Sequence, residues 1–504
     1  MILEDWIKLQ NGSDIRGVAM EGVPGEKVNL TARVSETLGR SFATWLNVKG
    51  FKNPGVAIGM DSRISGPMLK RAFCEGLTAS GVDVMDCGLA STPAMFMACI
   101  DENIKVDGAV MLTASHLPFN RNGIKFFTHR GGFDKQDIYD LLRIAADGPL
   151  PVSGPPGRVE TIDFLSVYAG ILANKIREGV RDVQRYEQPL RGIKIIVDAG
   201  NGAGGFFARK VLVPLGADTK GSQFLDPDGH FPNHVPNPED EGAMEAIIAA
   251  VKRTGADLGI IFDTDVDRAA VVDAKGKAIH RNELIALISA VILEEHPGTV
   301  IVTDSITSTG LTWFIETELG GIHLRFKRGY KNVINESKRL NEDGIASWLA
   351  IETSGHAALK ENYFLDDGAY LVAKLLVKMA ILKKENRSLT NLIEKLPVPE
   401  ESQEFRLRIT SEDFRAYGNK IISYIGERAL KVPGWALEEP NFEGIRVRCS
   451  HPQEKGWFLL RLSLHEALMP LNIESDVVGG VKAIASGLVK WLKKFKYLDI
   501  SPLL

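Results

Sequence analysis

The sequence has few cysteines, no long apolar run and no excess of positive charge. Four cysteines in 504 residues, with no CxxC pair and no zinc-ligand spacing, exclude a disulfide scaffold and predict reduced thiols. The longest apolar stretch, near 284–293, is about half the length of a membrane-spanning helix, and "MILEDWIKLQ" at the N-terminus does not resemble a signal peptide. A formal net charge of −4 argues against a general nucleic-acid binder. We therefore expect a cytoplasmic protein that binds neither membrane nor nucleic acid, with an organellar form as an open alternative.

Strands and helices alternate along most of the chain. Apolar strands that end in Asp, Gly or Ser before a loop recur at 56–63, 193–205, 258–268 and 300–310, with helical segments between them. This alternation is typical of βαβ units and mostly parallel or mixed sheets. After residue 403 the pattern changes to alternating strands followed by a terminal helix.

The chain length predicts several domains, because a single core stops growing well below this size. Pro/Gly-rich linkers at 146–160 and 396–403, and a weaker boundary near 280, divide the chain. We predict an α/β protein with three successive α/β domains with mixed sheets and a smaller C-terminal α+β domain, arranged around a central cleft. The predicted domains are residues 1–153, 154–280, 281–397 and 398–504.

The segment "TASHLPFNRNGIK" (113–125) follows a predicted buried strand at 106–112. Its Pro, Asn and Gly residues predict a loop, which puts Ser115 and His116 just past the carboxyl end of that strand. In open α/β sheets this edge is where ligands bind. The alternative is a surface turn that happens to contain Ser next to His.

The segment "DTDVDR" (263–268) follows the strand "LGIIF" and holds Asp263, Asp265 and Asp267. In extended backbone this spacing directs all three carboxylates to one side, where they repel one another unless a cation lies among them. An all-aspartate oxygen set suits Mg²⁺, and Arg268 suits a phosphate oxygen. The alternative is an acidic turn at a strand end.

The segment "GNGAGG" (200–205) follows a strand and satisfies G-x-G-x-x-G. A dinucleotide site, and with it an NAD-dependent oxidoreductase, is therefore a rival interpretation, but a single match is weak. A tight strand-to-helix turn is the interpretation we favour.

Four further segments combine Arg, Lys, Ser or His with loop residues: "SDIRG" (13–17), "RFKRGYKNV" (325–333), "ETSGH" (352–356) and "RLSLHE" (461–466). Each is on its own more typical of structure than of function. Together they suit a dianionic, hydroxyl-rich ligand such as a phosphorylated sugar, and the sequence has no Walker loop or kinase signature that would indicate a nucleotide donor.

In this combination and order, the segments resemble the α-D-phosphohexomutases, the phosphoglucomutase and phosphomannomutase family, over essentially the whole chain. "TASHLPFNRNGIK" is similar to the family's phosphoserine loop, "DTDVDR" to its metal loop, "ETSGH" to its sugar loop, and "RLSLHE" takes the place of its phosphate loop. The resemblance implies a Mg²⁺-dependent isomerase that interconverts hexose 1-phosphate and hexose 6-phosphate, of glucose and/or mannose. It implies a phosphoserine enzyme and a hexose 1,6-bisphosphate intermediate, with glucose 1,6-bisphosphate or a related compound as activator. The resemblance does not decide the oligomeric state, which is either a monomer or a small homo-oligomer.

The resemblance also implies a role for each of these residues. Ser115 would carry the phosphoryl group and, with Asp263, Asp265 and Asp267, hold the metal. The other residues implied in catalysis are His116, Lys125, Arg16, Arg268 and His356, and those implied in substrate binding are Glu352, Ser354, Lys331, Arg461, Ser463 and His465.

The phosphate loop departs most from the family pattern. Leu464 and His465 stand where the family has Gly-Thr, and Leu464 restricts the approach of backbone N–H groups to a phosphate. His465 could donate to the phosphate instead. The alternative to a mutase is therefore a non-catalytic or regulatory homologue that binds sugar phosphates.

Overall fold

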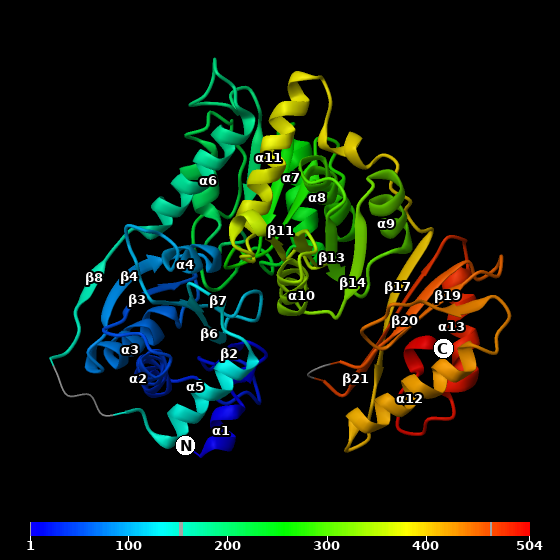
Figure 1. Cartoon of the computed structure of the whole chain (residues 1–504), viewed down its shortest axis with the longest axis horizontal. Helices are drawn as coiled ribbons and strands as arrows, with labels where there is room; N and C mark the ends of the chain where they lie inside the picture. Colours follow the sequence, from blue (N-terminus) through cyan, green and yellow to red (C-terminus); the bar gives the residue numbers. More distant parts are fainter. Residues whose placement is uncertain (1, 151–154, 464–465) are drawn as a thin grey trace. The chain divides into compact units, whose positions relative to one another are not determined.

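The computed structural model describes residues 2–150, 155–463 and 466–504 (Figure 1). It divides into two compact units, each formed by two separate parts of the chain. Unit 1 comprises Met1–Leu284 with Ser354–Asn391, and unit 2 comprises Ile285–Thr353 with Leu392–Leu504. None of the helices in the described residues is long and apolar enough to cross a membrane.

The first sheet of unit 1 has eight strands, seven of them in the order β1-β2-β6-β5-β3-β4-β8, with β7 paired to β6. It is mixed, because β6 is antiparallel to both neighbours while β5, β3, β4 and β8 are parallel. Figure 1 shows α2, α3 and α5 on one side of this sheet and α4 on the other. The strands are β1 (Gln10–Asn11), β2 (Asp14–Val18), β3 (Gly55–Met60), β4 (Asp83–Leu89), β5 (Gly108–Leu112), β6 (Arg121–Thr128), β7 (Gly131–Gly132) and β8 (Val159–Thr161). The helices are α1 (Leu3–Ile7), α2 (Ala32–Val48), α3 (Gly66–Ala79), α4 (Thr92–Ala98) and α5 (Lys135–Asp147).

The second sheet of unit 1 has the order β12-β11-β10-β9 and places the aspartate segment at a strand end. β10 is fully buried, as its unbroken apolar sequence predicts, and runs parallel to β9. Helix α7 is capped at both ends: the side chain of Asp240, just before the helix, accepts from Ala243 N, and Gly255, just after it, has the left-handed conformation. The remaining helices and strands of unit 1 are α6 (Phe164–Val180), β9 (Ile195–Asp198), a π-helix (Phe207–Leu212), α7 (Glu241–Thr254), β10 (Leu258–Phe262), β11 (Ala269–Asp273), β12 (Ala278–Ile279), α11 (Gly368–Lys384) and β16 (Ala357–Leu359), which is not part of this sheet.

Unit 2 contains a parallel sheet, in which β13 lies between β14 and β15. Its buried strands again carry continuous apolar runs, and β13 is buried along its whole length. The strands and helices of this part are α8 (Arg281–Glu295), β13 (Val300–Asp304), α9 (Thr309–Trp313), β14 (Ile322–Phe326), α10 (Tyr330–Glu342) and β15 (Ser347–Ile351).

The C-terminal part of unit 2 is a five-stranded antiparallel sheet in the order β17-β21-β20-β19-β18. Helices α12 and α13 contribute Ile421, Ile425, Ile484 and Leu488 to its hydrophobic core. The elements are β17 (Glu401–Arg408), α12 (Phe414–Ala429), β18 (Trp435–Leu437), β19 (Ile445–Cys449), β20 (Gly456–Leu460), β21 (Leu468–Ser475) and α13 (Gly480–Leu492).

The predicted fold class, three α/β segments and a smaller α+β segment, is confirmed. Two local details differ from the prediction. Strand β8 lies past the boundary expected after residue 153 but pairs with β4 in the first sheet. Residues Asn122 and Gly123, expected in a loop, belong to β6, because pairing with β2 overrides their loop preference.

Candidate active site

Ser115 lies just past the end of β5, as predicted, and is only 4% exposed. Its backbone is in the left-handed region, with φ of 51°, a conformation that costs a non-glycine residue roughly 1–2 kcal/mol. The Ser115 N–H donates to Thr113 Oγ1 at 2.9 Å, which holds this turn. The turn directs Ser115 Oγ to Asp263, and the hydroxyl donates to Asp263 Oδ2 at 2.9 Å.

The three aspartates converge, but not through extended backbone as the sequence predicted. Strand β10 ends at Phe262, and the chain then turns, with Val266 at φ of 68°. Asp263, Asp265 and Asp267 are each at most 1% exposed, and one oxygen from each lies within 4.8 Å of the others. A positive φ is a genuine outlier for a β-branched residue, so the aspartate turn is held by its surroundings.

These aspartates fit a hard divalent cation. Asp265 Oδ1 and Asp267 Oδ1 are buried and have no hydrogen-bond partner among the described residues, which leaves two oxygens available as ligands. Burial, and then the charges of Asp267 and Asp265, raise the pKa of Asp263 well above its usual value. A cation among the three carboxylates would offset this repulsion, and an all-oxygen set suits Mg²⁺.

Lys125 and Arg268 supply positive charge to the same cluster. Lys125 Nζ donates to Asp265 Oδ2 at 2.9 Å and to Asp267 Oδ2 at 2.5 Å. Although burial opposes it, the Lys125 ammonium lowers the pKa of Asp267, so this carboxyl stays ionised. Arg268 donates from Nε to Asp263 Oδ2 at 3.1 Å and from an Nη to Ser115 Oγ at 2.9 Å.

Arg16 lies on the neighbouring strand β2, where its backbone pairs with Gly123. Its guanidinium donates to Ala114 O at 3.4 Å and to Asp14 Oδ2 at 3.1 Å. The structure thus brings Arg16 to the residue before Ser115.

The two histidines predicted in catalysis, His116 and His356, have opposite protonation tendencies. Burial and the nearby Arg268 lower the pKa of His116 to about 3, so its ring is neutral at neutral pH. His116 Nδ1 lies 2.6 Å from an Arg268 Nη and therefore accepts from it, because arginine only donates. Burial would also lower the pKa of His356, but Asp366, at 2.5 Å from His356 Nδ1, and Asp267 raise it to about 9. His356 is therefore protonated at neutral pH.

Most of the predicted substrate-binding residues lie in unit 2, where Glu443 links their loops. Glu443 Oε2 accepts from Ser305 Oγ at 2.6 Å and from Arg328 N at 3.1 Å, and Glu443 Oε1 lies 3.8 Å from an Arg461 Nη. Glu352 Oε1 accepts from Gly329 N at 2.6 Å. Glu443, which the sequence did not single out, therefore connects the segment at Arg328 with Arg461 of the predicted phosphate loop, and Glu352 of the predicted sugar loop bonds to the same segment at Gly329.

The other predicted substrate-binding residues are Lys331, Ser463, Ser354 and His465. Lys331 lies in the first turn of α10, and Ser463 Oγ accepts from Glu466 N at 3.3 Å. Ser354, in unit 1, has a buried hydroxyl with no partner among the described residues. His465, together with Leu464, lies outside the described residues.

Two buried residues near Ser115 were missed by the sequence reasoning. Thr92 Oγ1 donates to Asp265 Oδ2 at 2.5 Å, and Thr92 N donates to Asp265 O at 2.8 Å. Arg63 is 1% exposed and bonds to backbone carbonyls of the loop that follows Ser115, at Leu117 and Pro118. The only signal for Arg63 was its place after the strand in "VAIGMDSR", where it follows an aspartate by two residues.

Packing accounts for the glycines of "GNGAGG". A Cβ on Gly202 would lie 2.6 Å from Thr264 O, and one on Gly205 would lie 2.1 Å from Leu225 O. Gly202 therefore lets this turn approach the aspartate turn closely, which supports the tight-turn interpretation.

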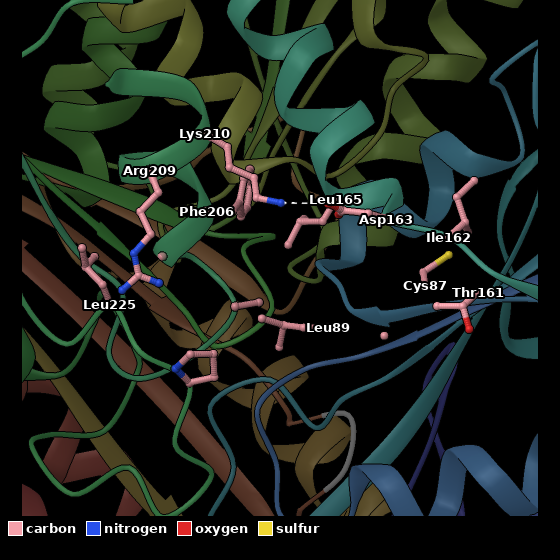
Figure 2. Close-up of a pocket in the computed structure, with 14 residues that line it drawn as sticks. Cys87, Leu89, Thr161, Ile162, Asp163, Leu165, Phe206, Arg209, Lys210 and Leu225 are labelled. Carbon is pink, nitrogen blue, oxygen red and sulfur yellow. Dashed lines mark hydrogen bonds and ion pairs between the residues drawn. The ribbon is translucent and has the colours of Figure 1, made fainter. Parts of the chain in front are cut away.

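A cavity of about 360 Å³ lies beside Gly205 (Figure 2). Its basic side chains already have acidic partners, since Lys210 Nζ lies 3.0 Å from Asp163 Oδ2 and an Arg209 Nη 2.5 Å from Asp226 Oδ1. Among its described lining residues are none of the predicted catalytic or metal-binding residues.

Comparison with known proteins identifies the family. Residues 8–145, 174–276 and 280–399 match the models of phosphoglucomutase/phosphomannomutase α/β/α domains I, II and III. A phosphomannomutase/phosphoglucomutase from Pseudomonas putida is 32% identical over 465 residues, which are 92% of this chain and 92% of that protein. The chain belongs to the phosphoglucomutase/phosphomannomutase family.

Other members agree with this assignment. A phosphoglucomutase from Neisseria gonorrhoeae is 29% identical over 94% of each chain. The crystal structure of a phosphoglucomutase/phosphomannomutase family protein from Burkholderia thailandensis superposes with a TM-score of 0.79, at 29% identity and 98% coverage of each chain. The resemblance inferred from the sequence is thereby confirmed, and this phosphohexomutase is an isomerase of the intramolecular phosphotransferase kind.

Proposed function

We propose that this phosphohexomutase interconverts hexose 1-phosphate and hexose 6-phosphate, with glucose or mannose as the sugar, through a phosphorylated Ser115. The observation that carries the proposal is the Ser115 hydroxyl, which lies 2.9 Å from both Asp263 Oδ2 and an Arg268 Nη. A serine oxygen between a three-carboxylate cluster and an arginine suits the transfer of a dianionic phosphoryl group. The names of the relatives support glucose and mannose as the sugars.

Asp263, Asp265 and Asp267 would hold Mg²⁺ together with the Ser115 oxygen. When bound there, the cation would withdraw charge from the phosphoryl group during its transfer. Arg268 would neutralise charge on the same group, because its Nη already donates to Ser115 Oγ. His116, as a neutral acceptor for Arg268, would keep that guanidinium aligned.

The reaction removes a proton from the oxygen that gains the phosphoryl group and supplies one to the oxygen that loses it. The substrate hydroxyl loses its proton when it takes the phosphoryl group, and Ser115 Oγ gains one when it leaves. His356 holds a proton at neutral pH because Asp366 and Asp267 face it, so it would donate to an oxygen that is losing the phosphoryl group. Lys125 and Arg16 would complete the charge balance, with Lys125 as a proton shuttle.

In this proposal Glu352 and Ser354 bind the sugar hydroxyls. Lys331, Arg461, Ser463 and His465 bind the phosphate that is not reacting. The bisphosphate intermediate then reorients in the active site and returns its other phosphate to Ser115. Added glucose 1,6-bisphosphate would phosphorylate Ser115 and so activate the enzyme.

A ³¹P NMR assay tests the function. The protein receives Mg²⁺ and a trace of glucose 1,6-bisphosphate, with glucose, mannose and glucosamine 1-phosphates offered separately. We expect a 6-phosphate product from glucose or mannose 1-phosphate that Ser115→Ala abolishes. The matched control is Ser289→Ala, which alters a fully buried serine in α8 and should keep the activity.

Two outcomes would contradict the proposal. If Ser115→Ala keeps the wild-type rate, Ser115 does not carry the phosphoryl group. If folded wild-type protein converts none of the sugars but binds them, the protein is the non-catalytic homologue that the departure at Leu464 and His465 favours.

A further inference from the structure

Arg63 is a buried arginine that bonds to four backbone carbonyls around Ser115. One Nη donates to Pro118 O at 2.8 Å and to Arg121 O at 2.9 Å. The other Nη donates to Leu117 O at 2.6 Å and to Ser115 O in a shorter bond. The guanidinium therefore holds the loop between β5 and β6 at Ser115 and at Arg121, the first residue of β6.

The Arg63 charge is compensated by Asp61 and covered by a loop from the second α/β segment. Arg63 Nε lies 3.4 Å from Asp61 Oδ2, and both side chains have zero exposure. The ring of Phe231 lies 5.3 Å from the guanidinium carbon. A Cβ on Gly229 would lie 2.5 Å from Ser62 O, so this loop also packs on the Arg63 backbone.

We infer that Arg63 is a positioning residue for Ser115, an inference that rests on the proposed phosphoserine function. Ser115 has a left-handed backbone, and its carbonyl bonds to Arg63 while its hydroxyl bonds to Asp263. Arg63 thus fixes the backbone carbonyl of Ser115, the residue whose hydroxyl reacts in the proposed function. A left-handed serine relaxes to the ordinary regions unless its surroundings hold it, and relaxation would turn Oγ away from Asp263.

Lysine cannot replace Arg63 in this role. The lysine ammonium would keep a positive charge beside Asp61, but its three N–H donors belong to a single nitrogen. The planar guanidinium reaches four carbonyls from two nitrogens. A displacement of the reacting atom by about 1 Å costs about 10²-fold in rate. We therefore expect Arg63→Lys to lower kcat by about that factor and to leave KM for the sugar phosphate nearly unchanged.

Arg446 provides a matched control. It is 3% exposed, lies 2.6 Å from Glu438 through Nε, and donates to Ser305 O at 2.9 Å and Thr307 O at 3.0 Å. Arg446→Lys therefore removes a comparable set of buried bonds in unit 2. A general loss of stability would lower Tm similarly in both variants, whereas positioning of Ser115 would lower kcat in Arg63→Lys only.

The experiment combines two measurements on wild type, Arg63→Lys and Arg446→Lys. The first is the single-turnover rate of phosphoryl transfer from glucose 1,6-bisphosphate to Ser115, with kcat and KM for glucose 1-phosphate. The second is backbone hydrogen exchange of residues 113–122, which needs no activity. We expect the slow transfer and the faster exchange of 113–122 in Arg63→Lys alone.

The results separate the inference from the proposed function. Unchanged exchange of 113–122 in Arg63→Lys, or an equal loss of kcat in Arg446→Lys, would overturn the positioning role. A wild type without turnover would overturn the proposed function, while exchange still tests whether Arg63 holds the turn. If Arg63→Lys does not fold, Asp61→Asn replaces it, with faster exchange confined to the same turn as the expected result.

Discussion

Removal of Lys125 tests whether positive charge is needed at the aspartate cluster. The Lys125 ammonium lies 2.9 Å from Asp265 and 2.5 Å from Asp267, and the three side chains are at most 7% exposed. Lys125→Met leaves both carboxylates buried without this partner. Breaking a buried pair from one side costs about 3–5 kcal/mol. With an m-value of about 3 kcal/mol/M, this lowers the urea midpoint of unfolding by about 1–2 M.

Urea unfolding in EDTA and in Mg²⁺ measures this effect. A cation bound by the aspartates replaces part of the lost charge, so Mg²⁺ should raise the midpoint of Lys125→Met more than that of wild type. The matched control is Lys383→Met, which breaks the exposed 2.7 Å pair with Asp257 and should change stability by about 0–1 kcal/mol. Equal urea midpoints of Lys125→Met and Lys383→Met in EDTA would refute the claim that Lys125 compensates the buried aspartate charge. An equal effect of Mg²⁺ on the midpoints of wild type and Lys125→Met would refute it as well.

Three further changes test other parts of the structure. Thr92→Val removes the 2.5 Å hydrogen bond to Asp265 and should weaken Mg²⁺ binding by about 10–100-fold, as measured by calorimetry; unchanged affinity would contradict this. Burial holds the pKa of His323 well below 6.5, so the folded protein excludes a proton that the unfolded chain binds, and stability falls as pH falls below that value. From about pH 7.5 to about pH 5.5, wild type should lose about 1.4 kcal/mol more than His323→Gln in chemical denaturation, and parallel pH profiles would refute this. Gly123→Ala places a Cβ 2.5 Å from a backbone oxygen and should cost about 1–3 kcal/mol, read from Tm. Gly170→Ala in α6, where the added Cβ meets nothing within 4 Å, should be neutral or slightly stabilising and serves as its control.

The amino-acid sequence by itself determined the fold class and the local positions of the proposed phosphoserine and of the first candidate metal ligand. The buried strands at Gly108–Leu112 and Leu258–Phe262 were predicted from their continuous apolar runs; Ser115 lies three residues past the first, and Asp263 directly follows the second. Such features depend on a few neighbouring residues, since burial of a short strand requires an apolar sequence whatever it packs against. The loop motifs that indicated the family also depend only on short runs of neighbouring residues.

The tertiary structure decided how those groups face one another. The aspartates converge through a turn with left-handed Val266, not through the extended backbone that their spacing predicted. Thr92 and Asp265 are 173 residues apart in the chain, and Arg63 and Ser115 are 52 apart, yet both pairs are hydrogen-bonded. Local periodicity carries no information about which distant segment lies opposite, because that depends on the packing of whole sheets and helices. For this reason the sequence predicted the serine and the metal ligands, and only the folded chain identified the residues that hold them in place.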